Sequence, residues 1–146
     1  MSTTAFAAAQ AVLLAALTAA PTLAGGHISA NPTRPLPAAH STAIVLRLDR
    51  AVGEEVPLGT LSWRTDYVVE VYARGSTGVD PVAAVDALLH SVWARLGGLT
   101  DAQIGGTLTM QPAVDWQYDA ADTPLVCAVV RVTVMHNTTT ASLTAV

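Results

Sequence analysis

Apolar and charged side chains alternate along residues 61–74, LSWRTDYVVEVYAR, and this alternation constrains the fold more than any other feature. One set of alternate positions holds Trp63, Thr65, Tyr67, Val69, Val71 and Ala73, and the other includes Arg64, Asp66, Glu70 and Arg74. A period of two is that of a strand, so the pattern predicts a strand with one face on a core. The charged face meets either solvent or the surface of a neighbouring subunit.

A helix is predicted to follow this strand, over residues 80–97. Asp80 is a good N-cap, and Pro81 suits the first helical position. An apolar stripe at spacings of three and four follows: Val82, Val85, Leu88, Leu89, Val92, Trp93 and Leu96. Arg95 lies off this stripe, and Gly97-Gly98 end the helix.

The first 26 residues are alanine-rich and predict a second helix, with Phe6, Gln10, Leu13 and Leu17 on one face. Pro21 and the following glycines end it. A cleaved secretory signal over residues 1–24 is the alternative interpretation. The helix is favoured because a signal needs a positive leading segment, and no basic side chain precedes Arg34.

The remaining pattern predicts short strands separated by polar or proline-rich segments. Residues 27–30 read as a short extended piece, 31–40 as a rigid connector with three prolines, and 49–59 as a polar turn carrying Glu54 and Glu55. Strands are expected at 41–48, at 107–117 with Pro112 marking an edge or a bulge, and at 125–136 in the centre of the sheet.

These elements predict an α+β fold: a mixed or antiparallel sheet of four to five strands with two helices packed on one face. Residues 1–136 form the single domain. The polar tail, residues 137–146, is expected to be a C-terminal arm.

The charge composition excludes several functions. The chain has seven arginines, eleven acids and no lysine, for a net charge of -4. A phosphate-binding P-loop and Schiff-base catalysis both need a lysine. The arginines are scattered along the sequence, which argues against a nucleic-acid-binding stripe. With 51% hydrophobic and only 12% charged residues, the chain is expected to cover apolar surface with partners.

No catalytic, metal or cofactor site is predicted. Asp66 and Glu70 share a face but lie about 13 Å apart along a strand, beyond the roughly 5–9.5 Å of glycosidase pairs. Asp115, Asp119 and Asp122 could suggest a cation site, but they surround a predicted turn, and turns commonly carry Asp for local hydrogen bonding, so metal binding there is the less favoured interpretation. Cys127 is interpreted as a small core residue. The histidines are far apart and are interpreted as ordinary surface or core residues: His27, His40, His90 and His136.

Five stretches carry a family resemblance that spans roughly residues 5–143. They are AAPTLAGG, RPLPAAHSTAIVLRL, WRTDYVVEVYARG, DPVAAVDALLHSVWARLGG and LVCAVVRVTVMHNTTTASL. In this order and spacing the chain resembles the tail terminator proteins of long-tailed bacteriophages, the minor tail protein U-like tail completion family. Related neck and tail-completion proteins share the plan helix-strand-strand-helix-strand-strand.

The resemblance implies a structural role without catalysis or cofactors. Subunits of this family assemble with copies of themselves into a hexameric ring on the end of the tail tube. The ring stops tube polymerisation and provides the surface for the neck or head-completion protein. The protein would be assembled in the host cytoplasm and lie at the head-proximal end of the virion tail. It would contact the tail tube protein and no membrane, with genomic DNA only passing through the lumen.

The subunit interface is predicted from physical arguments, because the family offers no short motif to transfer. The charged strand face is the first candidate: Arg64, Asp66, Glu70 and Arg74. The loop with Glu54 and Glu55 and the 137–146 arm are the next two. A neck or head-closure connector is the alternative function, and a secreted or periplasmic domain is a second alternative.

Overall fold

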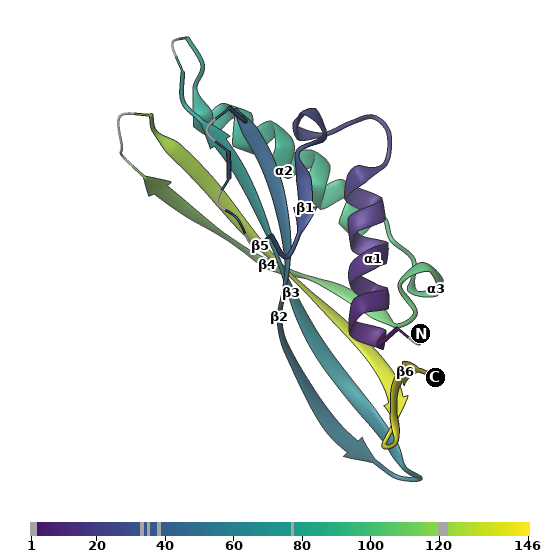
Figure 1. Cartoon of the computed structure of the whole chain (residues 1–146). Coiled ribbons are helices and arrows are strands. Elements are labelled where there is room, and N and C mark those ends of the chain that lie inside the picture. Colours follow the sequence, from purple (N-terminus) through teal and green to yellow (C-terminus); the bar gives the residue numbers. More distant parts are fainter. Residues whose placement is uncertain (1–2, 33, 35, 38, 77, 120–122) are drawn as a thin grey trace.

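The computed structural model describes residues 3–32, 34, 36–37, 39–76, 78–119 and 123–146. It is α+β, with a mixed, curled sheet and two main helices packed against it (Figure 1). In chain order the elements are α1 (Ala5–Thr18), η1 (Ala24–Gly26), β1 (Ile28–Ala30), β2 (Thr42–Val56), β3 (Thr60–Arg74), α2 (Pro81–Gly97), α3 (Asp101–Ile104), β4 (Thr107–Asp119), β5 (Leu125–Thr139) and β6 (Ser142–Ala145). The predicted fold class is confirmed.

The sheet has the strand order β1-β2-β3-β5-β4, with β6 paired to the far end of β5. Among the strands that the structure describes, only β1 is parallel to its neighbour. The central position of β5 agrees with its nearly continuous apolar sequence. In β4, the ladder shifts register between Met110 and Val114, so Pro112 sits in an irregular edge strand as predicted.

Helix α1 begins at the N-cap Thr4, whose hydroxyl accepts a hydrogen bond from the Ala7 amide at 3.2 Å. Leu13 and Leu17 are fully buried, as their spacing predicts. The rest of the buried face consists of small alanines, while Phe6 packs edge-on against Trp63 with ring centroids 5.1 Å apart. Small side chains allow the helix to lie close to the sheet.

Helix α2 begins and ends where the sequence predicts, with the Asp80 carboxylate accepting from the Val82 amide at 3.0 Å. Its buried residues are Val85, Val92 and Leu96.

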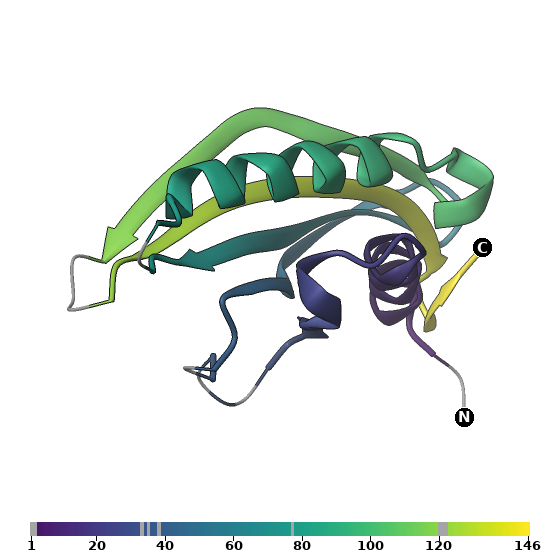
Figure 2. The ribbon, with the colours of Figure 1, turned by 90° about the horizontal axis from the view of Figure 1, so that it is seen from above.

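The structure assigns Arg95 a role that the sequence pattern does not indicate. Its guanidinium donates to the carbonyls of Leu17 and Ala19 at 3.0 and 2.6 Å, and so satisfies acceptors at the end of α1. Figure 2 shows α1 nearly end-on and α2 from the side, so the two helices cross.

The prediction of a polar turn over residues 49–59 is wrong. Strand β2 continues to Val56 and pairs with β3 down to Thr60. A register shift between Leu48 and Arg50 interrupts the alternation at this point, so the second half of the strand looks irregular in sequence. The two strands therefore extend past the helices as a long hairpin (Figure 1).

Residues 137–146 also differ from the predicted arm. Asn137 to Thr139 continue β5 beside β3, and β6 turns back to pair with β5. Trp63 donates from its indole nitrogen to the buried Thr138 hydroxyl at 2.9 Å. Backbone pairing to the hairpin orders this polar segment without requiring apolar side chains. Within the described residues, no helix is long and apolar enough to cross a membrane.

His136 makes stability depend on pH. It is 5% exposed beside Phe6, and burial lowers the pKa of His136 below its usual 6.5. As pH falls below 6.5, the unfolded chain takes up this proton first, so the native state should lose stability by up to about 1.4 kcal/mol per pH unit. Thermal unfolding between pH 8 and pH 5 should show a smaller loss for His136→Leu than for the unsubstituted protein. Equal losses in the two proteins would contradict this assignment.

Candidate functional site

The candidate interface is the helix-free face of the sheet, to which alternate residues of the long strands point. One row across this face joins Val45, Glu70, Val129 and Asp115 on β2, β3, β5 and β4. The opposite face carries the helices and the buried core, with Val69, Val71 and Val130 fully buried. The alternation along residues 61–74 therefore separates core from helix-free face as predicted.

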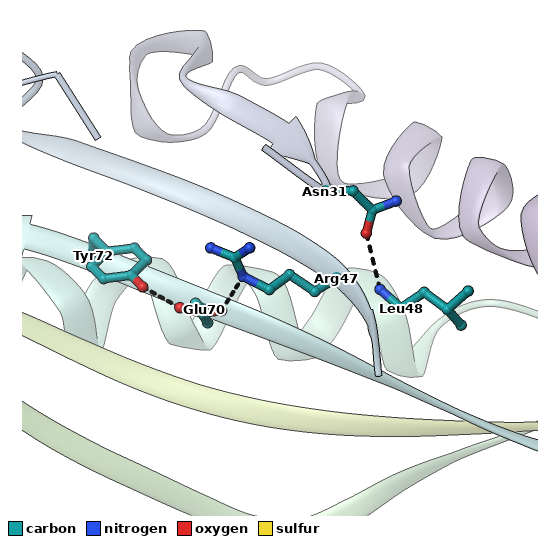
Figure 3. Close-up of polar contacts among 5 residues, drawn as sticks. All are labelled: Asn31, Arg47, Leu48, Glu70 and Tyr72. Carbon is teal, nitrogen blue, oxygen red and sulfur yellow. Dashed lines mark hydrogen bonds and ion pairs between the residues drawn. The ribbon is translucent and has the colours of Figure 1, made fainter. Parts of the chain in front are cut away.

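Glu70 is held within the subunit. Arg47 Nε lies 2.6 Å from Glu70 Oε1, and the Tyr72 hydroxyl donates a hydrogen bond to Glu70 Oε2 (Figure 3). Burial, followed by the contact with Glu70, raises the pKa of Tyr72 above its usual 10. The hydroxyl therefore remains a proton donor at physiological pH.

Asp66 is likewise paired across the strands. It accepts a hydrogen bond from the Thr133 hydroxyl at 2.8 Å, and Gln111 donates to the same hydroxyl oxygen at 3.1 Å. Arg64 approaches Asp66 only to 3.9 Å, and its side chain is 63% exposed. Of the four residues of the predicted charged strand face, Arg64 has the most exposed charge.

Arg74 anchors the connector instead of facing a partner. It is half-buried and donates from Nη2 to the Leu36 carbonyl at 3.2 Å. Its buried Nε has no hydrogen-bond partner in the described part of the chain. The charged strand face predicted from sequence spacing is therefore divided among three different local networks.

Glu54 and Glu55 are both exposed on the hairpin, but they do not form one acidic site. Glu54 lies opposite Ser62 and Glu55 opposite Leu61, on neighbouring rungs of the ladder. Neighbouring residues of a strand point to opposite faces, so the two carboxylates point apart.

Two partners of this face escape sequence reasoning. Arg47 pairs with Glu70, and Arg131 lies 2.5 Å from Asp115. The only signal in the sequence is that the paired residues carry opposite charges. They can be matched only once the register of the neighbouring strands is known. Asp122, grouped with Asp115 at the sequence level, lies outside the described residues.

The single cysteine of the chain is not an activated nucleophile. Cys127 is buried, and that burial raises its pKa from 9.0 to about 11, which keeps the thiol protonated and unreactive. In the described part of the chain, no three His, Cys, Asp or Glu side chains gather as a metal site. No family matches the sequence, and no curated protein is significantly similar to it.

Proposed function

We propose that this protein is a structural subunit of a homo-oligomeric ring that caps the tail tube of a long-tailed bacteriophage and provides the head-joining surface. The observation that carries the proposal is the order of the main elements, α1-β2-β3-α2-β4-β5. It agrees with the helix-strand-strand-helix-strand-strand plan that the family resemblance implies. The additions are short: η1, β1, α3 and β6.

Uncovered strand edges support self-assembly. Among the described residues, β1 pairs with β2 only along Ile44 to Leu46 and no other strand pairs with the outer edge of the hairpin, while β4 ends the opposite side of the sheet. Such edges can pair with another chain. Pairing of unlike edges is a head-to-tail contact, which closes into a ring when the rotation between subunits allows it.

Exposed apolar side chains lie at both edges. Val52 is 48% exposed on the hairpin, Leu58 is fully exposed at its tip, and Tyr118 is 67% exposed on β4. Together with the low charge content, these residues favour burial against a neighbouring copy over permanent exposure to water.

Arg64→Glu tests whether the helix-free face takes part in the ring interface, since Arg64 lies on the internal strand β3 and not at an edge. We expect the variant to fold normally, because Arg64 is exposed, and to lose rings in negative-stain electron microscopy and light scattering, because a carboxylate replaces the accessible cation. Arg74 is left unchanged, since its contact with Leu36 would confuse folding with assembly. Ala87→Glu, on the exposed side of α2, is the matched control and should still form rings. Normal rings from Arg64→Glu would remove this face from the interface.

Deletion of the gene in its phage distinguishes a tail terminator from a neck or head-closure connector, by electron microscopy of the lysate. Overlong tubes without heads support termination of tail growth. Normal tails beside unattached heads would assign the protein to the neck or head-closure connector instead. Normal infectious particles would overturn both functions.

The second alternative, a secreted or periplasmic domain, makes a different physical demand. Removal of residues 1–24 would delete α1 and uncover the core beneath Leu13 and Leu17, which are fully buried. The intact mass of the purified protein distinguishes the two, since cleavage would remove about two dozen residues.

A further inference from the structure

A pocket of about 680 Å³ opens between the proline-rich connector and the helix-free face near β1, β2 and β3. Three of the chain's seven arginines line it: Arg34, Arg47 and Arg74. None of the residues that line it is acidic in the part of the chain that the structure describes. The lining of the pocket is therefore positively charged, although the protein as a whole has a net charge of -4.

The fold builds this pocket from both ends of the connector. Asn31 adopts a φ of 46°, a conformation that asparagine tolerates better than most residues, and it turns the chain away from β1. Its side-chain oxygen accepts from the Leu48 amide at 3.1 Å (Figure 3). At the other end, the rings of His27 and His40 stack in parallel with centroids 3.5 Å apart. The connector is thus held at both ends, to β2 through Asn31 and to the residue before β1 through His40.

The guanidinium groups of the pocket retain capacity for a ligand. Arg47 binds Glu70 through Nε alone, and this ion pair offsets the negative charge of the Glu70 carboxylate next to the pocket. Arg74 is held by the Leu36 carbonyl through Nη2, while its buried Nε has no partner among the described residues. A buried donor without a partner is costly. Because Arg74 lines the pocket, an anion in the pocket is a candidate acceptor for this nitrogen.

The rest of the lining is largely apolar. Leu36 from the connector, Val45 from β2 and Leu125 from β5 contribute hydrocarbon surface to the same cavity. Ligand sites commonly combine such a surface with a few convergent polar groups. A cavity that served only inorganic ions would not need this apolar surface.

We propose that this pocket binds an organic anion, with a carboxylate or phosphate group among Arg34, Arg47 and Arg74 and an apolar body against Leu36, Val45 and Leu125. Guanidinium groups match the planar or tetrahedral oxygens of these anions with paired hydrogen bonds. The pocket lies on the same helix-free face as the candidate ring interface and shares Arg74 with it. Its test uses Arg34 and Arg47 and measures binding, so it can fail separately from the ring test at Arg64.

Isothermal titration calorimetry at low salt tests the site with phenyl phosphate, phenylacetate and the neutral phenylacetamide, and with inorganic phosphate. We expect saturable binding of at least one aromatic anion with a Kd below about 1 mM, and no binding of the amide. Comparison of phenyl phosphate with phenylacetate identifies the preferred charged group. Stronger binding of the aromatic anion than of inorganic phosphate reports the apolar contacts.

Arg34→Gln and Arg47→Gln should each weaken binding roughly tenfold or more, since each removes charge-assisted hydrogen bonds. Arg50→Gln is the matched control, because Arg50 is exposed on the same strand as Arg47 but does not line the pocket. Circular dichroism checks that all three variants fold. No saturable heat for either aromatic anion up to about 5 mM would overturn the proposal. Binding unchanged in both Arg34→Gln and Arg47→Gln would overturn it equally, by placing the anion elsewhere.

Discussion

Val92→Asp is expected to abolish the cooperative unfolding transition of this protein. Val92 is fully buried on α2, in the core cluster shared with α1 and the sheet. An aspartate there would either bury an unpaired charge or unfold the helix from the sheet, at a cost of at least about 4 kcal/mol. Natural domains have only about 5–15 kcal/mol of stability in total, so little or none would remain. Urea unfolding followed by circular dichroism measures this loss.

Leu89→Asp is the matched control on the same helix. The sequence pattern places Leu89 in the middle of the apolar stripe, but the structure leaves it partly exposed beside a shallow groove with His90 and Trp93. Its carboxylate could remain in water, so the variant should fold and lose clearly less stability than Val92→Asp. Equal losses at the two positions would show that α2 presents a different face to the sheet.

Gly106→Ala is expected to destabilise the protein by about 1–3 kcal/mol although it adds a single methyl group. A Cβ at Gly106 would lie 2.2 Å from the carbonyl oxygen of Met135 on β5. Backbone cannot move aside as a flexible side chain can, so the start of β4 would have to shift away from β5. The change in the midpoint of urea unfolding reports this cost.

Gly97→Ala is the control for the same chemical change. Gly97 is the last residue of α2, and no heavy atom of the described part of the chain lies within 4 Å of a Cβ placed there. Alanine loses less conformational entropy than glycine in a helix, so this variant should be stabilised by up to about 1 kcal/mol. If Gly106→Ala left the stability unchanged, the backbones of β4 and β5 would have to lie farther apart at this point than the 2.2 Å contact implies.

Much of the fold could be predicted because local patterns carry it. The alternation along β3, the Asp80-Pro81 start of α2 and the apolar run of β5 each specify an element and its buried face. The predictions fail for segments that are held in the sheet by backbone hydrogen bonds to a neighbouring strand and not by apolar side chains. The second half of β2 and the end of β5 have polar sequences, but each is hydrogen-bonded to β3 along its length.

The candidate interface was predictable only in part. The spacing of Arg64, Asp66, Glu70 and Arg74 places them on one face, and the structure agrees. Their partners lie on other strands or on the connector: Arg47, Thr133 and Leu36. Sequence spacing along one strand contains no information about which neighbour lies beside it, so it could not indicate that most of these charges are already satisfied.

The sequence by itself determined the fold class, the main elements and the side of each long strand that faces the core, because side-chain periodicity acts over a few neighbouring residues. Only the tertiary structure decided which charges meet. Arg34, Arg47 and Arg74 are scattered along the chain, yet the connector, β2 and β3 bring them to one pocket. Register and chain reversal decide such contacts, and both depend on the packing of the whole sheet rather than on local sequence.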